Sequence, residues 1–267
     1  MSHWYDSPYS DEKVPSVTTI LSIIAKIWLM LWYAKSERRF CAKVLFEAFQ
    51  GLRHFESAED VEAYIASRFE EEHGNDNKYI AQVESKQAMD LGSLVHGMVD
   101  AYWQVWEKKE IEEADWVILP HEQYMAFLSD YYPTEAIKML GAYFRCLREN
   151  NIIILSTEQT VHHFEGFSGT LDMTARVNGI KAIGDLKTGD PERIGPPAVP
   201  RYEHRLQLEA YRRCVKPEPT GRFVIYLRKD KFAGKYCFWF EDLNKQNEED
   251  WQDFLAAKRL FNSMNRR

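Results

Sequence analysis

Two aspartates and a lysine in the second half of the chain have the types and spacing that metal-assisted hydrolysis requires. Asp172 closes the segment Gly169-Thr170-Leu171-Asp172, and a single leucine separates Asp185 from Lys187. Two neighbouring carboxylates repel each other and need a cation to stay ionised. Mg²⁺ binds carboxylate oxygens together with waters and phosphate oxygens, and it can activate water beside a phosphoryl group. The pattern therefore predicts a Mg²⁺ or Mn²⁺ site that hydrolyses a phosphate ester, with a surface ion pair between strand residues as the plainer alternative.

The elements around these residues predict how they come together. Residues 152–164 are rich in β-branched side chains, and 171–177 alternate apolar and polar side chains as a strand does. Asn178-Gly179 is a signal for a type I′ hairpin turn, with 180–186 as the returning strand. The segment 152–187 is thus predicted to be a three-stranded antiparallel meander. Pairing across its turn places Asp172 beside Asp185, and Lys187, two residues further on, faces the same way.

The rest of the chain predicts a mixed α/β fold. Residues 1–13 are expected to form an arm, and helical periodicity dominates from Ile20 to Asn150, with breaks near Gly74 and two prolines. After the meander we expect, in order, a proline-rich loop, a helix, two strands and a final helix, at 191–200, 203–214, 222–228, 236–240 and 246–261.

Composition sets limits on the class of protein. The 267 residues carry a net charge of −7, so there is no overall basic excess to indicate a nucleic-acid binder, although local basic groups remain possible. The four cysteines are far apart in sequence, which favours free thiols in a reducing compartment. The N-terminus has no apolar signal segment, and the apolar stretch Ile20–Tyr33 is shorter than the roughly 20 residues that span a bilayer. We expect a soluble, intracellular, cytoplasmic protein without a membrane partner.

The spacing Asp172…Asp185-Leu186-Lys187 resembles the motif of the PD-(D/E)XK nucleases, whose core also matches the predicted strand order. Further segments are similar to its RecB-like branch, which includes phage exonucleases, the mitochondrial genome maintenance exonuclease and CRISPR-associated nucleases. They are a helix with Gln207-x-x-x-Tyr211, a Gly92-x-x-x-His96 motif and an entry segment, Pro15–Leu21. The resemblance implies a restriction-endonuclease-like core at 151–267, with a central mixed sheet flanked by helices, and a helical region at 1–150 that arches over the site.

The resemblance also implies roles for individual residues. Asp172 and Asp185 would bind the metal together with the Leu186 carbonyl and His96, and Glu158 would support the site through water. Lys187 would be the catalytic lysine, placed to position or deprotonate the attacking water or to offset negative charge. Gln207 and Tyr211, one helical turn apart, would line the site and contact Lys187 or the scissile phosphate. Phosphate contacts are expected from five more residues: Arg38, Arg39, Lys43, Thr188 and Arg205.

Each assignment has a plainer alternative. His96 and Tyr211 could be core residues, Glu158 a strand-edge residue, and Arg38, Arg39 and their neighbours a solvated helix face. The aromatic residues of the helical region could stack on unpaired bases, but they more often form helix core. Some relatives bind an iron–sulfur cluster through one N-terminal and three clustered C-terminal cysteines. No such cysteine cluster follows Phe240 here, so we expect no iron–sulfur centre.

These observations predict a metal-dependent DNA exonuclease of recombination, repair or replication. The sequence has no base-reading motif, which favours an exonuclease over a sequence-specific endonuclease. DNA, as a single strand or a duplex end, would be the partner, and a recombination or annealing protein is a partner by analogy alone. A structure-specific endonuclease and a non-catalytic DNA-binding module stay open. A phosphoesterase acting on small molecules is disfavoured by the lack of a histidine-rich ligand set.

Overall fold

The computed structural model describes most of the chain, namely residues 4–51, 53–74, 80–107, 121–194, 198–243 and 248–265. Its contacts divide the chain into two units, one formed by residues 1–24 with 91–267 and the other by residues 25–90. The division differs from the predicted boundary at residue 150, because the helices between 91 and 149 pack with the sheet in the first unit.

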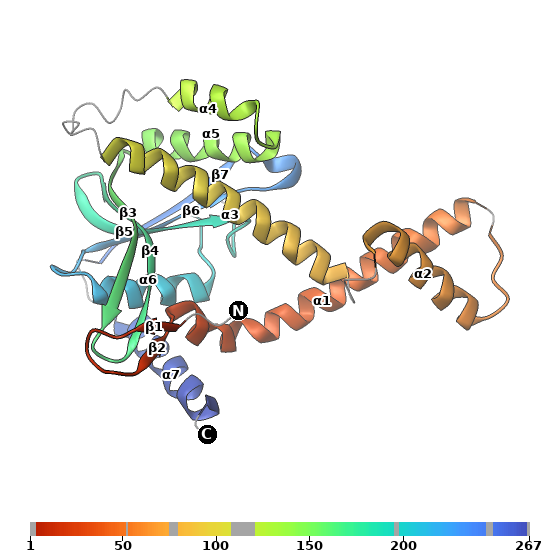
Figure 1. The fold of residues 1–267 in the computed structure, drawn as a ribbon, viewed down its shortest axis with the longest axis horizontal. Coiled ribbons are helices and arrows are strands. Elements are labelled where there is room, and N and C mark those ends of the chain that lie inside the picture. The colour runs from red at the N-terminus through yellow and green to blue at the C-terminus, as the bar shows by residue number, and fades with distance from the viewer. Residues whose placement is uncertain are drawn as a thin grey trace. The chain divides into compact units, whose positions relative to one another are not determined.

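A five-stranded mixed sheet forms the centre of the larger unit (Figure 1). Neighbouring strands are antiparallel except β5 and β6, which are parallel because α6 connects them. The strands follow each other across the sheet in chain order: β3 (Ile152–His163), β4 (Phe167–Val177), β5 (Ile180–Thr188), β6 (Gly221–Leu227) and β7 (Tyr236–Asp242). This arrangement confirms the predicted mixed α/β class and the flanked mixed sheet.

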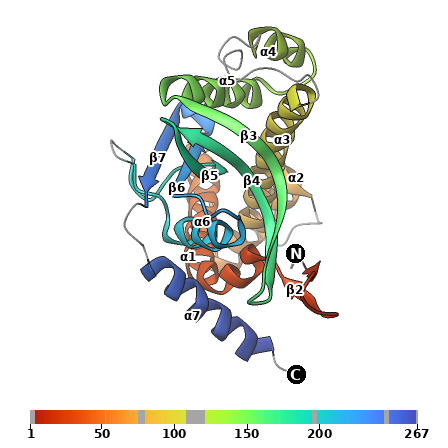
Figure 2. The same ribbon diagram turned by 90° about the vertical axis from the view of Figure 1, so that its left-hand side faces the viewer.

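Helices cover both faces of this sheet (Figures 1 and 2). On one face, α5 (Thr134–Glu149) and the second half of α3 (Ile80–Glu107) share a core with β3, β4 and β6, and α4 (His121–Ser129) packs beside α5. On the other face, α6 (Tyr202–Cys214) and α7 (Glu248–Asn265) enclose a second core. Burial on both faces explains why every residue of β6 is buried, so that this strand is a continuous apolar run apart from Gly221 and Arg222.

The predicted meander is confirmed, with one difference at its first turn. Asn178 and Gly179 have φ values of 50° and 85°, the left-handed conformation that a type I′ turn requires at both positions. The predicted strands leave the segment 165–170 between them, but β4 already begins at Phe167. Gly166 alone takes the positive φ of 77° in that segment, so Gly169 lies inside the strand.

The prediction that residues 1–13 form an arm is wrong. Trp4–Asp6 (β1) pairs with Lys13–Pro15 (β2) as an antiparallel hairpin. The Tyr5 hydroxyl lies 3.2 Å from Thr170 Oγ1 on β4, and Ser16 forms a bridge with Ser168. A polar segment that would not fold alone is thus ordered by β4, a contact that local sequence does not reveal.

The smaller unit is helical. It contains most of α1 (Val17–Gln50), all of α2 (Ala58–His73) and the beginning of α3. Ser57 caps α2 by accepting a hydrogen bond from the Asp60 amide at 3.1 Å, and Gly74 ends the helix with a φ of 69°, at the predicted break. Its small core joins Phe40 and Val44 to α2. None of the described helices in either unit combines the length and apolarity needed to cross a membrane.

Candidate metal centre

Three carboxylates lie in a row across the first three strands of the sheet. The pairs Thr157–Met173 and Gln159–Leu171 on either side set Glu158 opposite Asp172. The ladder between β4 and β5, continued by one residue, sets Asp172 opposite Asp185. Glu158 has a φ of 49°, which is unusual for a residue with a side chain and lies near the β3 irregularity. Acidic side chains are uncommon in strands, so a row of three is a feature that local folding preferences do not explain.

Asp185 is the buried member of the row, and its two oxygens differ. Oδ1 accepts hydrogen bonds from the Lys187 ammonium at 2.7 Å and from Gln207 Nε2 at 3.3 Å. Oδ2 lies 2.6 Å from Lys187 Nζ, but it receives no hydrogen bond of acceptable geometry from the described residues. The side chain is only 1% exposed, so bulk solvent does not reach this oxygen. A buried carboxylate oxygen with no donor is what a metal ligand looks like before the ion binds.

Asp172 links Asp185 to a second group of ligand atoms. Its Oδ2 accepts the Leu186 amide at 2.8 Å and lies 3.9 Å from His96 Nδ1. One ligand atom from each of His96, Glu158 and Asp172 falls within 4.8 Å of the others. These side chains line a pocket of about 10 Å³, which has room for about one water or one small ion. The role of the Leu186 carbonyl as a metal ligand stays a prediction.

The electrostatics of the site favour a cation. Burial, together with the negative charge of Asp172, raises the pKa of Asp185 despite the neighbouring Lys187. Glu158 is exposed as a residue, but partial burial of its carboxyl group and the charges of Asp172 and Asp100 raise its pKa to about 7. Burial lowers the pKa of His96, so its imidazole is neutral at pH 7 and can donate a lone pair. Burial also opposes the charge of Lys187, but the two aspartates outweigh it and raise the pKa of this lysine.

Helix α6 carries Gln207 and Tyr211, which the resemblance assigned to the lining of the site. Gln207 contacts Asp185 rather than Lys187. Tyr211 is 2% exposed and packs on Gly169, where a Cβ atom would lie 2.6 Å from the tyrosine ring. The strand glycine therefore makes room for the ring. Burial, Asp172 and Asp185 raise the pKa of Tyr211, which keeps its hydroxyl protonated.

The residues predicted to contact phosphate are distributed over both units. Arg205 forms an ion pair with Asp250 at 2.7 Å, and Thr188 lies against Gly92 of α3. The other three, Arg38, Arg39 and Lys43, belong to the smaller unit, where Lys43 pairs with Glu72 at 3.1 Å. Nucleic-acid contact by any of these five residues stays a prediction.

Asp100 and Thr157 belong to the pocket but were missed from the sequence. Asp100 follows His96 by four residues on α3, so both project from the same helix face. Thr157 donates a hydrogen bond to Asp100 Oδ1 at 3.1 Å. The helical spacing from His96 was a signal that could have identified Asp100, whereas nothing in the sequence identified Thr157.

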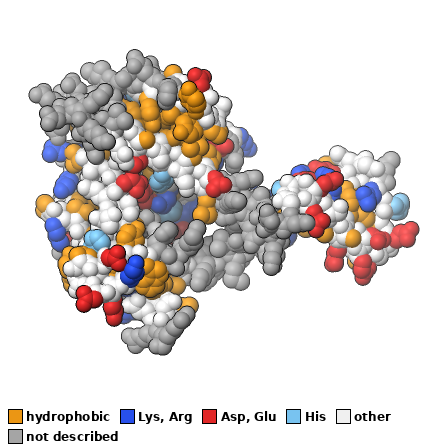
Figure 3. Space-filling model, viewed as in Figure 1, with side chains coloured by type: hydrophobic (Ala, Val, Ile, Leu, Met, Phe, Trp, Pro, Cys, Tyr) orange, Lys and Arg blue, Asp and Glu red, His pale blue; other side chains and the backbone are white. Residues whose placement is uncertain are grey.

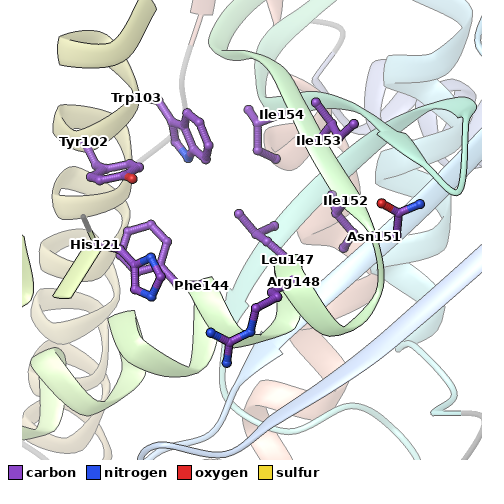
Figure 4. Close-up of a pocket in the computed structure, with 10 residues that line it drawn as sticks. All are labelled: Tyr102, Trp103, His121, Phe144, Leu147, Arg148, Asn151, Ile152, Ile153 and Ile154. Carbon is purple, nitrogen blue, oxygen red and sulfur yellow. The ribbon is translucent and has the colours of Figure 1, made fainter. Parts of the chain in front are cut away.

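The hollows of the larger unit differ from one another in chemistry. In one hollow of its surface, Figure 3 shows acidic, basic and histidine side chains gathered together. A separate cavity of about 110 Å³ is lined mainly by apolar side chains of α3, α5 and β3, among them Tyr102, Trp103 and Phe144, with Arg148 and Asn151 also present (Figure 4). None of the described residues that line it carries a carboxylate, so these residues do not offer the ligands that a hard cation requires.

The comparisons with known proteins agree with this geometry. The sequence profile of the PD-(D/E)XK nuclease superfamily matches residues 57–266, which is most of the chain. A comparison with functionally curated proteins finds no significant match. Among solved structures, the crystal structure of SSO0001 has 12% sequence identity, with 55% of this chain and 68% of that chain covered and a TM-score of 0.30. That TM-score is too low to support any conclusion.

Proposed function

Since this chain belongs to the PD-(D/E)XK nuclease superfamily, we propose that it is a divalent-metal-dependent DNA exonuclease built around Asp172, Asp185 and Lys187. One observation carries the proposal. The two aspartates meet across the β4–β5 hairpin with Lys187 on the same face, and one buried oxygen of Asp185 has no hydrogen-bond donor among the described residues. Buried polar atoms are rarely left in this state, so this oxygen supports a ligand role for Asp185.

The residues at the site fit a hard divalent cation such as Mg²⁺ or Mn²⁺. Asp172 and Asp185 would hold it, with His96, Glu158 and the Leu186 carbonyl as further ligands. Excess negative charge and a neutral imidazole support this set. A bound divalent ion supplies an activated water and offsets charge on a phosphoryl oxygen.

Lys187 and Gln207 would act beside the ion. Lys187 now donates to Asp185, and when that carboxylate has another cation partner, the ammonium can turn to a water or a phosphate oxygen. There it would position the nucleophile and offset the negative charge that develops during hydrolysis. Gln207 would hold Asp185 in place through its amide. Tyr211 would keep a protonated hydroxyl close to both aspartates.

The finer assignment follows from the sequence motifs. The Gly92-x-x-x-His96 and Gln207-x-x-x-Tyr211 segments support the RecB-like branch, as do the distances of 3.9 Å from His96 to Asp172 and 3.3 Å from Gln207 to Asp185. DNA ends would be the substrate, in recombination, repair or replication and therefore inside a cell, with an annealing protein as a partner by analogy.

A cleavage assay tests this proposal. End-labelled linear single- and double-stranded DNA, linear RNA and closed circular DNA would each be incubated with Mg²⁺, Mn²⁺ or EDTA. We expect metal-dependent loss of linear DNA while circles survive, and the fate of the label gives the polarity. Cut circles would favour an endonuclease, and degraded RNA would change the substrate class. No cleavage with either metal would contradict the proposal and favour a binding module.

A further inference from the structure

A carboxylate that lies outside the shared motif is held on both of its oxygens at the edge of the metal pocket. Asp100 Oδ1 accepts from Thr157 Oγ1 at 3.1 Å, and its Oδ2 accepts from Gln104 Nε2 at 2.6 Å. Gln104 follows Asp100 by four residues on α3, so one helical turn fixes the carboxylate and leaves Oδ1 directed at β3. Asp100 is therefore held in place to accept a hydrogen bond from Thr157 on the neighbouring strand β3.

Thr157 directly precedes Glu158, the residue with the unusual backbone conformation. Glu158 has its positive φ of 49° between Thr157 and Gln159, both of which keep their pairing with β4. A glutamate in this left-handed conformation is strained, and neighbouring contacts must hold it there. The Thr157–Asp100 hydrogen bond is such a contact, since it ties β3 to α3 immediately before the strained residue.

The strained conformation has a consequence for ligand placement. It brings the Glu158 carboxylate within the 4.8 Å group that also contains His96 and Asp172. His96 and Asp100 lie on the same face of α3, so the helix provides one ligand directly and anchors the strand that provides another. Supporting contacts of this kind commonly alter metal affinity by about 10–100-fold when they are removed.

We infer that Asp100 is a positioning residue of the metal centre, which acts through Thr157 to hold Glu158 in its ligand position. The inference rests on the proposed function, because it concerns the same site. Asp100 itself does not touch the metal or the substrate in this assignment.

Mn²⁺ binding to the full-length protein, measured by calorimetry and by electron paramagnetic resonance, tests the inference. Asp100→Ala and Thr157→Val should each weaken binding about tenfold or more, and the double variant should be no weaker than either, because both remove one hydrogen bond. Thr157→Ser keeps the hydroxyl and should restore affinity. Asp100→Asn should restore most of it, since the amide oxygen can accept from Thr157 and the exposed Gln104 amide can rotate.

Two controls separate positioning from general stability. Asp253 on α7 also accepts one hydrogen bond, from Tyr202 at 2.6 Å, but it does not line the pocket, so Asp253→Ala should leave Mn²⁺ affinity unchanged. In a Glu158→Gln background, Asp100→Ala should have little further effect. Wild-type affinity in Asp100→Ala, or an undiminished effect without Glu158, would overturn the inference.

The proposed function and this inference fail in different ways. If wild-type protein binds no Mn²⁺, or Asp172→Ala binds it equally well, the proposed metal centre is wrong. Metal-free crystal structures of wild type and Thr157→Val then decide the inference alone. Glu158 should leave the His96–Asp172 group in the variant, and an unmoved Glu158 would contradict the positioning role.

Discussion

Helix α6 lies between two buried polar regions that differ in how their charges are balanced. Its Gln207 and Tyr211 face the carboxylate row, while Glu209, Arg212 and Arg213 face a network of ion pairs. Both regions are rich in charge, and both lie in the same unit. The comparison shows what distinguishes a charge cluster that stabilises the fold from one that is arranged for chemistry.

In the network, charges are matched. Arg222 is completely buried and contacts the carboxylates of Glu209, Glu241 and Asp250. Glu209, also fully buried, receives two further hydrogen bonds from Arg212. In the candidate metal centre, by contrast, the three carboxylates of the row face one ammonium. Each region has one buried atom without a hydrogen-bond partner among the described residues, Asp185 Oδ2 in the site and Arg205 Nε in the network. The excess of carboxylates over cations therefore distinguishes the site, because buried charge without enough opposite charge is costly.

Removing Lys187 should produce the largest change in chemistry. Lys187→Ala should lower the cleavage rate by about a thousandfold or more, because the proposed role of this ammonium is to offset the negative charge that develops during hydrolysis, while binding of DNA stays largely intact. Single-turnover cleavage and DNA-binding titration measure the two effects. Lys181→Ala, at the start of the same strand, is the matched control and should cleave normally. Wild-type cleavage by Lys187→Ala would show that the site is assigned wrongly.

Breaking the network should instead affect stability. Arg222→Leu removes the fully buried cation that Glu209 and Asp250 share, so we expect the free energy of unfolding to fall by about 3–5 kcal/mol. Denaturant titration measures it, with Arg222→Lys as a milder variant if the first does not fold. The Arg228–Asp190 pair is more exposed, and Arg228→Ala should cost no more than about 1 kcal/mol. Equal losses in both variants would remove the distinction between buried and exposed pairs.

Gly169 tests whether Tyr211 belongs to the site or only to the core. Gly169→Ala introduces a Cβ atom 2.6 Å from the tyrosine ring, so it should cost about 1–3 kcal/mol of stability by overpacking. If Tyr211 serves the chemistry, cleavage per folded molecule should also fall. Gly97→Ala meets nothing within 4 Å and should stabilise α3 by up to about 1 kcal/mol. Unchanged cleavage in Gly169→Ala would leave Tyr211 as a core residue.

The smallest effect is expected at Glu158, and its sign depends on pH. The pKa of Glu158 is about 7 in the folded chain against 4.5 for an ordinary glutamate. The folded state therefore binds this proton more tightly than the unfolded state, and its ionisation reduces metal-free stability as pH rises from about 4.5 to 7. Glu158→Gln should raise the metal-free melting temperature at pH 8 and leave it nearly unchanged at pH 4.5. Because the residue is exposed, the gain should stay under about 1 kcal/mol.

Thermal unfolding at the two pH values, with EDTA present, measures this difference. Glu241→Gln is a useful contrast, because Glu241 binds Arg222 and its neutral form should destabilise the chain at pH 8. If both variants change stability in the same direction, the carboxylate row is compensated as the network is, and the comparison fails.

The sequence by itself determined the β4–β5 hairpin and the residues that it brings together. Asn178-Gly179 fixes the turn, and the turn fixes the register that sets Asp172 beside Asp185. Lys187 then follows from strand alternation. These contacts lie close together in the chain, so local rules suffice.

Tertiary structure alone decided the remaining features of the site. The positive φ of Glu158, the Thr157–Asp100 contact and the distance from His96 to Asp172 depend on how α3 packs against the sheet. The same holds for Gln207, because its helix α6 connects β5 to β6 and must fold back to pack on β5. These contacts join distant segments, so their geometry is set by burial of both sheet faces and not by local spacing.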